Sequence, residues 1–114
     1  MAKNQIKNPF GPEPVAITYN MKWDGGIYSG MLNNAGVPHG LGRRVGLETV
    51  YEGEFNNGQR TGFARQIERQ RCYLGNFVNG WKTGLGYQIS TSNKVKEGVF
   101  EKDKLVRAQV TNML

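Results

Sequence analysis

The sequence is poor in the features of a disulfide-stabilised, secreted or membrane-spanning protein. Cys72 is the only cysteine in 114 residues, so no internal disulfide can form, and a reducing compartment is favoured. No apolar run approaches the ~18 residues that a transmembrane helix needs. Residues 1–10 hold two lysines, no arginine and no apolar core, so we expect no secretory signal there. We predict an intracellular protein; a mitochondrial presequence is disfavoured but stays open.

The sequence also offers little catalytic or metal-binding chemistry. His39 is the only histidine, and within GVPHGLG it is expected to be an exposed turn residue. Cys72 directly precedes Tyr73 and is expected to be a packing residue rather than a nucleophile. No His, Cys and carboxylate set has the spacing of a zinc site, and GLGRRVG lacks the GxGxxG spacing and the lysine of a phosphate loop. We therefore predict no enzyme activity, no metal, no cofactor and no small-molecule substrate.

The sequence is rich in glycine and poor in the apolar residues that form ordinary cores. The chain has 16 glycines, and apolar residues make up 38%, below the usual ~45–50%. The length predicts one domain. A compact two-layer core is poorly supplied by this composition, so a thin, glycine-rich β architecture is favoured. The net charge of +6 suits an acidic partner or an anionic surface without choosing between them.

One sequence pattern recurs with a period of 22–23 residues. YEGEFNNGQRTG at 51–62 is followed by YLGNFVNGWKTG at 73–84, and weaker copies lie on both sides. The predicted organisation is an entry segment at 1–14, a repeat domain at 15–104 and a C-terminal cap or partner-binding tail at 105–114. Within the repeat domain we place a half repeat at 15–27, repeats at 28–50, 51–72 and 73–95, and a degenerate repeat at 96–104.

Each repeat is predicted to be a β-hairpin. YEGEF alternates as a half-buried strand does, with Tyr51, Gly53 and Phe55 on one side and Glu52 and Glu54 on the other. Asn57-Gly58 and Asn79-Gly80 are the favoured pairs for two-residue turns in which both residues have positive φ. GFARQIERQ and GLGYQISTS are then the return strands. A single hairpin is marginal in water, so the hairpins must stack.

The recurring glycines are predicted to form flat beds for aromatic rings. Gly62, Gly84 and Gly86 should accept rings from a neighbouring repeat, with Ala64 as a tighter version, because glycine inside a strand marks a close approach. The residues expected to pack the repeats together are Tyr28, Gly30, Tyr51, Gly53, Phe55, Gly62, Tyr73, Gly75, Phe77, Gly84 and Gly86.

The columns Tyr-x-Gly-x-Phe/Trp-x-x-Gly-x-x-x-Gly-x-Gly resemble the MORN repeat (membrane occupation and recognition nexus). The resemblance implies an all-β fold: an elongated, single-layer, twisted antiparallel sheet of successive β-hairpins. It implies no catalysis. It implies a scaffold subunit that binds other protein subunits in a larger assembly, in a cytoplasmic, cytoskeletal or ciliary location. Phospholipid binding is also proposed for such repeats, so a peripheral module for anionic membranes is the alternative.

The return strands hold a second set of periodic columns, apolar and basic. Rows of exposed apolar side chains mark interaction sites, so these columns are the candidate partner-binding residues: Leu41, Arg43, Val45, Phe63, Arg65, Ile67, Leu85, Tyr87 and Ile89. For the membrane alternative the candidate lipid-binding residues are Arg43, Arg44, Arg60, Arg65, Arg69 and Arg71. Glutamates interspersed with these arginines count against that alternative. Nucleic acid is disfavoured, because no nucleic-acid-binding motif is present.

The C-terminal segment is expected to close the end of the sheet or to reach a partner. On a helix its apolar residues would share one broad face, which favours a short C-terminal helix over a strand: Leu105, Val106, Val110, Met113 and Leu114.

Overall fold

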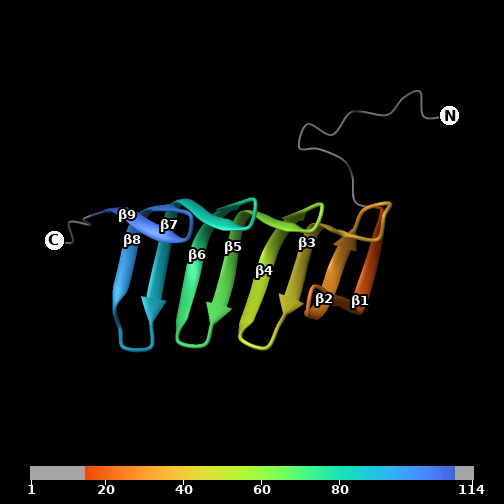
Figure 1. The fold of residues 1–114 in the computed structure, drawn as a ribbon, viewed down its shortest axis with the longest axis horizontal. Helices are drawn as coiled ribbons and strands as arrows, with labels where there is room; N and C mark the ends of the chain where they lie inside the picture. The colour runs from red at the N-terminus through yellow and green to blue at the C-terminus, as the bar shows by residue number, and fades with distance from the viewer. Residues whose placement is uncertain (1–14, 110–114) are drawn as a thin grey trace, which may run out of the picture.

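The computed structural model describes residues 15–109, which form one open antiparallel sheet with its strands in chain order (Figure 1). The strands are β1 (Ala16–Trp23), β2 (Gly26–Leu32), β3 (Pro38–Val45), β4 (Thr49–Asn56), β5 (Gln59–Glu68), β6 (Arg71–Val78), β7 (Trp81–Ser90), β8 (Val95–Glu101) and β9 (Lys104–Ala108). The molecule measures 58 × 32 × 24 Å. The predicted single-layer sheet of successive hairpins is confirmed. The predicted entry segment at 1–14 lies outside the described residues.

The predicted C-terminal helix was wrong where the structure describes the segment. Lys104–Ala108 is strand β9, which pairs with β8 from Glu101↔Lys104 to Gly98↔Ala108. Lys102 and Asp103 have φ of 47° and 71°, so they form a tight turn that returns the chain to the free edge of β8. Residues 110–114 lie outside the described part. Within residues 15–109 no helix is long and apolar enough to cross a membrane.

The predicted hairpin turns are confirmed. Asn57 and Gly58 have φ of 48° and 89°, and Asn79 and Gly80 have φ of 50° and 86°. These are the left-handed conformations that Asn and Gly adopt most easily, and their twist matches that of the flanking strands. Each turn also contacts the preceding hairpin, since Gly58 N–H donates to Pro38 O (2.8 Å) and Gly80 N–H donates to Arg60 O (3.0 Å).

One face of the sheet, here called the tyrosine face, carries the core. Its six rings are buried or nearly so and form an unbroken series of edge-to-face contacts with centroids 4.9–5.3 Å apart. In order of contact the rings are Tyr28, Phe55, Tyr51, Phe77, Tyr73 and Phe100. Such pairs contribute about 0.5–1.5 kcal/mol each beyond their burial. The rings therefore join successive hairpins into one cooperative structure.

The tyrosines lie flat on a row of small residues. Cross-strand partners in this row, from β2 to β9, are Gly30, Gly42, Gly53, Ala64, Gly75, Gly86, Gly98 and Ala108. A Cβ at Gly75 or Gly86 would lie 2.5 Å from Tyr73 Oη. Each ring reaches along its own strand, and Tyr73 Oη–H donates to Asn76 O (3.0 Å). Burial raises the pKa of Tyr73 to about 12, so its hydroxyl stays a donor.

The structure corrects the role predicted for Gly62 and Gly84. A Cβ at Gly84 would meet nothing within 4 Å, and one at Gly62 would meet only Glu54. Both glycines have positive φ, 68° and 76°, and lie where the strand register shifts. They are β-bulge residues, for which glycine supplies the backbone conformation. Gly86 does lie against a ring, but that ring belongs to Tyr73 of its own repeat.

His39 is also not the exposed turn residue that was predicted. It lies in β3 with 6% of its surface exposed, and its Nδ1 accepts a hydrogen bond from the backbone N–H of Asn57 (3.0 Å). The imidazole thus ties the Asn57-Gly58 turn to the preceding hairpin.

Candidate interaction surfaces

The strand register places the predicted partner-binding residues on the face opposite the tyrosines. Tyr51 pairs with Gln66 and Tyr73 pairs with Gln88, so the residues on either side of each glutamine project from the other face. We call this other face the strip face. Three rows of side chains cross it, each made of cross-strand partners or near neighbours.

Two of the rows carry apolar side chains. In one, Leu41, Phe63 and Leu85, which are 59%, 67% and 61% exposed, alternate with polar residues, because Leu41 pairs with Glu54 and Phe63 pairs with Asn76 on the strands between them. The other runs without interruption from β2 to β8 through seven cross-strand partners: Ile27, Val45, Val50, Ile67, Cys72, Ile89 and Val95. Of the predicted set, Val45, Ile67 and Ile89 belong to this longer row. In this longer row, further apolar residues on the intervening strands fill the gaps of the predicted column.

The added residues carry a sequence signal that our prediction missed. Ile27, Val50 and Cys72 directly precede the repeat tyrosines, and Val95 holds the same place in the fourth repeat. An apolar residue just before each Tyr-x-Gly therefore marks the opposite face of the outgoing strand.

Three hollows lie along this longer row, beside the loops that join successive hairpins. Ile27 and Val45 line the first, of about 660 Å³. Val50 and Ile67 line the second, of about 230 Å³. Ile67 also lines the third, of about 310 Å³, together with Cys72 and Ile89. The surface along this row is therefore hollowed at intervals rather than flat.

The third row of the strip face lies between the apolar rows and carries charge. Glu52 stands between Arg43 and Arg65 and pairs with both, at 3.0 Å from Arg43 Nε. The hydrogen bond from Arg65 lowers the pKa of Glu52. Leu74, Tyr87 and Glu97 continue the row across β6, β7 and β8.

The six arginines proposed for lipid binding do not form one surface. Arg43 and Arg65 lie on the strip face, whereas Arg44 and Arg60 line a pocket on the tyrosine face. The remaining two pair with glutamates: Arg69 with Glu48 at 3.8 Å, and Arg71 with Glu68 at 2.6 Å. Four of the six are thus ion-paired within the chain.

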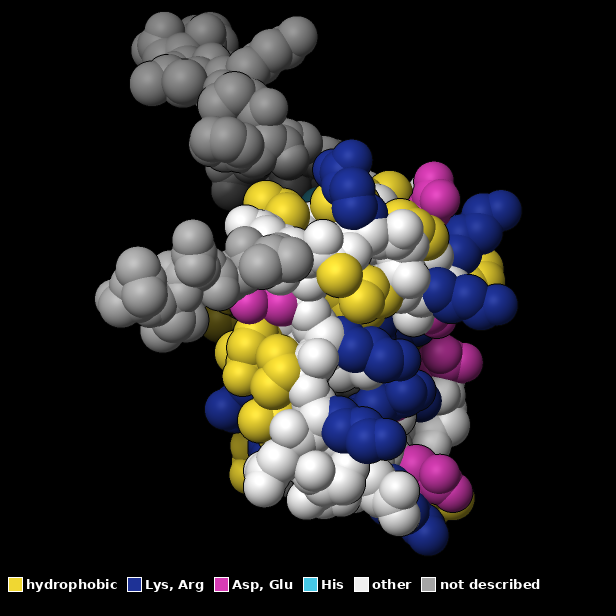
Figure 2. Space-filling model, turned by 90° about the vertical axis from the view of Figure 1, so that its left-hand side faces the viewer, with side chains coloured by type: hydrophobic (Ala, Val, Ile, Leu, Met, Phe, Trp, Pro, Cys, Tyr) yellow, Lys and Arg dark blue, Asp and Glu magenta, His cyan; other side chains and the backbone are white. Residues whose placement is uncertain are grey.

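The end-on view of the molecule shows how unevenly side chains are distributed around it. Seen from the β9 end, hydrophobic side chains gather along one flank, and Lys and Arg side chains cluster across the middle and the opposite flank (Figure 2). Seen from this end, the basic side chains are therefore concentrated rather than spread evenly.

A buried ion pair lies on the tyrosine face. Lys82 is only 3% exposed, and its Nζ donates to Glu68 Oε2 (2.8 Å) and Gln88 Oε1 (3.1 Å). Burial alone would raise the pKa of Glu68, but hydrogen bonds from Lys82, Arg71 and Gln66 outweigh it and lower the pKa to about 2. The ammonium also lies 5.1 Å from the centre of the Tyr73 ring. This site is fully satisfied.

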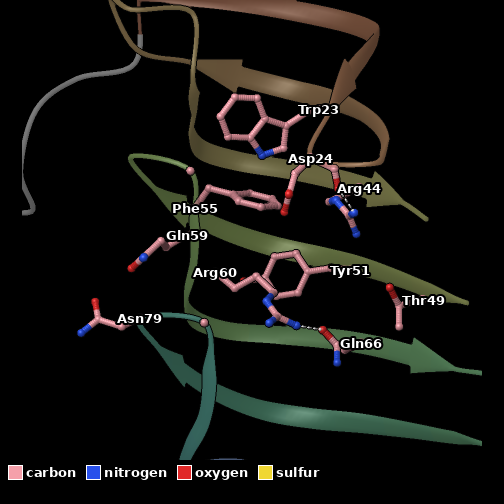
Figure 3. A pocket seen from close by; sticks show the side chains of 12 residues that line it. Trp23, Asp24, Arg44, Thr49, Tyr51, Phe55, Gln59, Arg60, Gln66 and Asn79 are labelled. Carbon is pink, nitrogen blue, oxygen red and sulfur yellow. Dashed lines mark hydrogen bonds between the residues drawn. The ribbon is translucent and has the colours of Figure 1, made fainter. Parts of the chain in front are cut away.

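A pocket of about 350 Å³ opens on the same face at the preceding hairpin (Figure 3). Its walls combine aromatic rings, two arginines, one carboxylate and small polar residues: Trp23, Asp24, Arg44, Thr49, Tyr51, Phe55, Gly58, Gln59, Arg60, Gln66, Asn79 and Gly80. The Arg60 guanidinium donates to Gln66 Oε1 and lies 5.3 Å from the centre of the Phe77 ring. Within residues 15–109 no three His, Cys, Asp or Glu side chains gather as a metal site would require.

Comparison with known proteins agrees with the repeat that the hairpins display. A family model of the MORN repeat matches residues 51–66 and 73–94, which take in most of the hairpins β4–β5 and β6–β7. A search of curated proteins finds no match.

Proposed function

Because the chain belongs to the MORN-repeat family, we propose that it is a non-catalytic scaffold subunit that binds protein partners through its strip face. MORN repeats generally serve as protein- or membrane-interaction modules. The assembly we propose is intracellular, cytoplasmic or attached to the cytoskeleton or a cilium. The single observation that carries the proposal is the unbroken apolar row from Ile27 to Val95.

The dimensions of this row suit a protein partner. Seven strands at about 4.8 Å spacing give a row of about 29 Å. Exposed apolar patches of this kind are uncommon on proteins that bind nothing, and they resemble the centres of protein interfaces. A second row, in which Leu41, Phe63 and Leu85 alternate with polar residues, runs parallel to the first, and each of these three residues is more than half exposed. A partner with apolar residues on both sides of a polar line would cover both rows.

The charged row between them would set orientation more than affinity. Arg43, Glu52 and Arg65 are paired with one another, so they enter an interface with a net charge of +1 and few unsatisfied groups. Affinity would then depend on the apolar anchors, of which Phe63 is the largest and, at 67%, the most exposed.

The proposal is tested by Phe63→Asp combined with Ile67→Asp in protein purified with its partners from the native source. Both side chains are exposed, so the variant should keep its circular dichroism spectrum and melting temperature but lose the partner. Asn34→Asp with Ala35→Asp is the matched control, since it adds the same charge at two exposed residues of the loop between β2 and β3, outside the rows of the strip face. A wild-type protein that purifies as a lone monomer, or a double variant that keeps its partner, would refute the proposal.

The alternative, a peripheral module for anionic membranes, has less support, because four of its six candidate arginines are paired with glutamates. Co-sedimentation with phosphatidylserine vesicles tests it directly. Electrostatic binding would rise with anionic lipid content and fall with salt.

A further inference from the structure

The repeat supplies an internal reference for the pocket at Arg60. Residues 22 apart hold equivalent places in successive hairpins: Arg60 pairs with Phe55 as Lys82 pairs with Phe77, and Gln66 pairs with Tyr51 as Gln88 pairs with Tyr73. By the same spacing, Gly46 is the equivalent of Glu68. The two sites can therefore be compared group by group.

At the later site the set of partners is complete. Lys82 has a glutamine oxygen from Gln88 and a carboxylate from Glu68, which lies one hairpin earlier. At the earlier site Arg60 has the equivalent glutamine oxygen, from Gln66, but Gly46 has no side chain to supply the carboxylate. Among residues 15–109 no ion pair involves Arg60.

A second cation lines the same pocket. Arg44 donates through Nη2 to the backbone carbonyl of Asp24, while its Nε is buried and has no hydrogen-bond partner in the part of the chain that the structure describes. Figure 3 shows Arg44 and Arg60 among the rings that line the pocket. Gln66 and Gln88 hold the equivalent position in the later hairpins, so Arg44 is a departure from the glutamine found there.

We propose that this pocket binds the carboxylate of an aspartate or glutamate side chain from a protein partner. The carboxylate would occupy the place that Glu68 occupies at the later site and would pair with Arg60 and Arg44. An adjoining apolar side chain of the partner would pack on Trp23 and Phe55, which line the pocket. A volume of about 350 Å³ accommodates one or two side chains rather than a folded element.

The charge of the pocket favours a carboxylate over a phosphate. Two arginines and the Asp24 carboxylate give a formal charge of +1 among the lining residues. This balances a carboxylate, whereas a phosphate monoester carries about −1.5 to −2 at neutral pH and would leave the occupied pocket with a net negative charge. The inference rests on the proposed function in one respect, that the occupant of the pocket belongs to a protein. It does not depend on the strip face, because the pocket lies on the opposite face of the sheet.

The first test titrates the full chain with the dipeptide Ac-Phe-Glu-NH2 while the Nε–Hε NMR signals of the arginines are followed. The signals of Arg44 and Arg60 should shift and saturate, and Ac-Phe-Gln-NH2 should leave them unchanged. Arg44→Gln should weaken binding about tenfold or more, because hydrogen bonds between charged groups are lost. This variant should fold, because glutamine holds the equivalent places in β5 and β7. Arg69→Gln removes the same charge outside the pocket and should bind as wild type does.

The second test supplies the missing carboxylate from the chain itself. A Cβ at Gly46 would lie 3.2 Å from Arg44 Nη1, which is the movable end of a side chain. Gly46→Glu should therefore pair with Arg44, raise the melting temperature by a few degrees and abolish binding of the acidic dipeptide. Gly46→Gln, with the same shape and no charge, should do neither.

Several results would overturn the inference. Equal binding of the glutamine and glutamate dipeptides would show that the pocket recognises the apolar side chain and not the carboxylate. Tighter binding of inorganic phosphate, or shifts caused only by phosphatidylserine vesicles, would assign it to phosphate or to a membrane. Absence of any saturable shift would remove the site altogether. The Phe63→Asp, Ile67→Asp variant should still bind the dipeptide, so failure of the strip-face proposal is separable from failure of this one.

Discussion

The hairpins β4–β5 and β6–β7 share a scaffold but differ in the polar groups that complete it. Both have the Tyr-x-Gly-x-Phe strand, an Asn-Gly turn with positive φ and a bulge glycine. In the second hairpin the buried cation Lys82 is neutralised by Glu68. In the first, Arg60 opens onto a pocket with Arg44 and no pairing carboxylate among the described residues. The residues that fold the repeat recur, whereas the polar residues that complete each hairpin differ from one repeat to the next.

The largest expected loss of stability comes from placing a side chain larger than Ala64 at the equivalent position of the second hairpin, Gly86. Gly86→Val should destabilise the protein by about 3 kcal/mol or more, because even a Cβ there would lie 2.5 Å from Tyr73 Oη. Gly86→Ala is the graded control and should cost less, because Ala64 holds the equivalent place beside Tyr51. Urea unfolding monitored by tyrosine fluorescence measures both, and equal stabilities would show that the row is not tightly packed.

The next effect comes from removing the carboxylate that distinguishes the later site. Glu68→Gln should destabilise the protein by about 2–3 kcal/mol, because it leaves the Lys82 ammonium buried without its counter-charge. Glu48→Gln is the control, because its pair with Arg69 is exposed and should contribute less than about 1 kcal/mol.

The same carboxylate predicts a pH dependence. The pKa of Glu68 falls from an ordinary 4.5 to about 2 in the folded protein, so its contribution is fully present above about pH 4.5 and is lost as pH falls towards 2. Between these values the wild type should lose more stability than Glu68→Gln does. Parallel pH profiles for the two proteins would show that Glu68 is not the group responsible.

A smaller effect is expected at the bulge glycines, where the two hairpins are alike. Gly84→Ala should cost about 1 kcal/mol, because the φ of 76° is unfavourable for a residue with a Cβ although the space around it is open. Gly84→Asn should cost less, because asparagine tolerates this conformation better. If Gly84→Val and Gly86→Val prove equally damaging in thermal melts, crowding rather than backbone conformation limits position 84.

Much of this fold could be predicted because the sequence of each repeat specifies its own strands and turn. The alternation in YEGEF and the Asn-Gly pairs specify strand, turn and return strand locally, and three copies fix the period. The roles of Gly62 and Gly84 could not be predicted, because the bulges shift the register between outgoing and return strands. Without that register, a ring cannot be assigned to the glycine beneath it.

The site was less predictable than the fold. The strip was found in part, since its columns on the return strands are periodic, but its continuation through Val50 and Cys72 depends on cross-strand pairing. The pocket was missed because it joins Trp23 and Arg44 to Arg60 from different repeats, and because Arg44 departs from the repeat instead of following it. At β9, Lys102-Asp103 lacks the Asn-Gly signal, so helical periodicity misled the prediction.

The strand order has a consequence for how this molecule loses its structure. Among residues 15–109 every strand is hydrogen-bonded only to strands adjacent in the sequence, from β1 at one end to β9 at the other. Stability is then close to a sum over neighbouring hairpins, as in a one-dimensional chain of coupled units. Opening starts most easily at the two ends, whose strands have one neighbour each, and moves inward. The centre of the sheet, at β4 to β6, is therefore protected by position as well as by packing, and amide hydrogens there should exchange last.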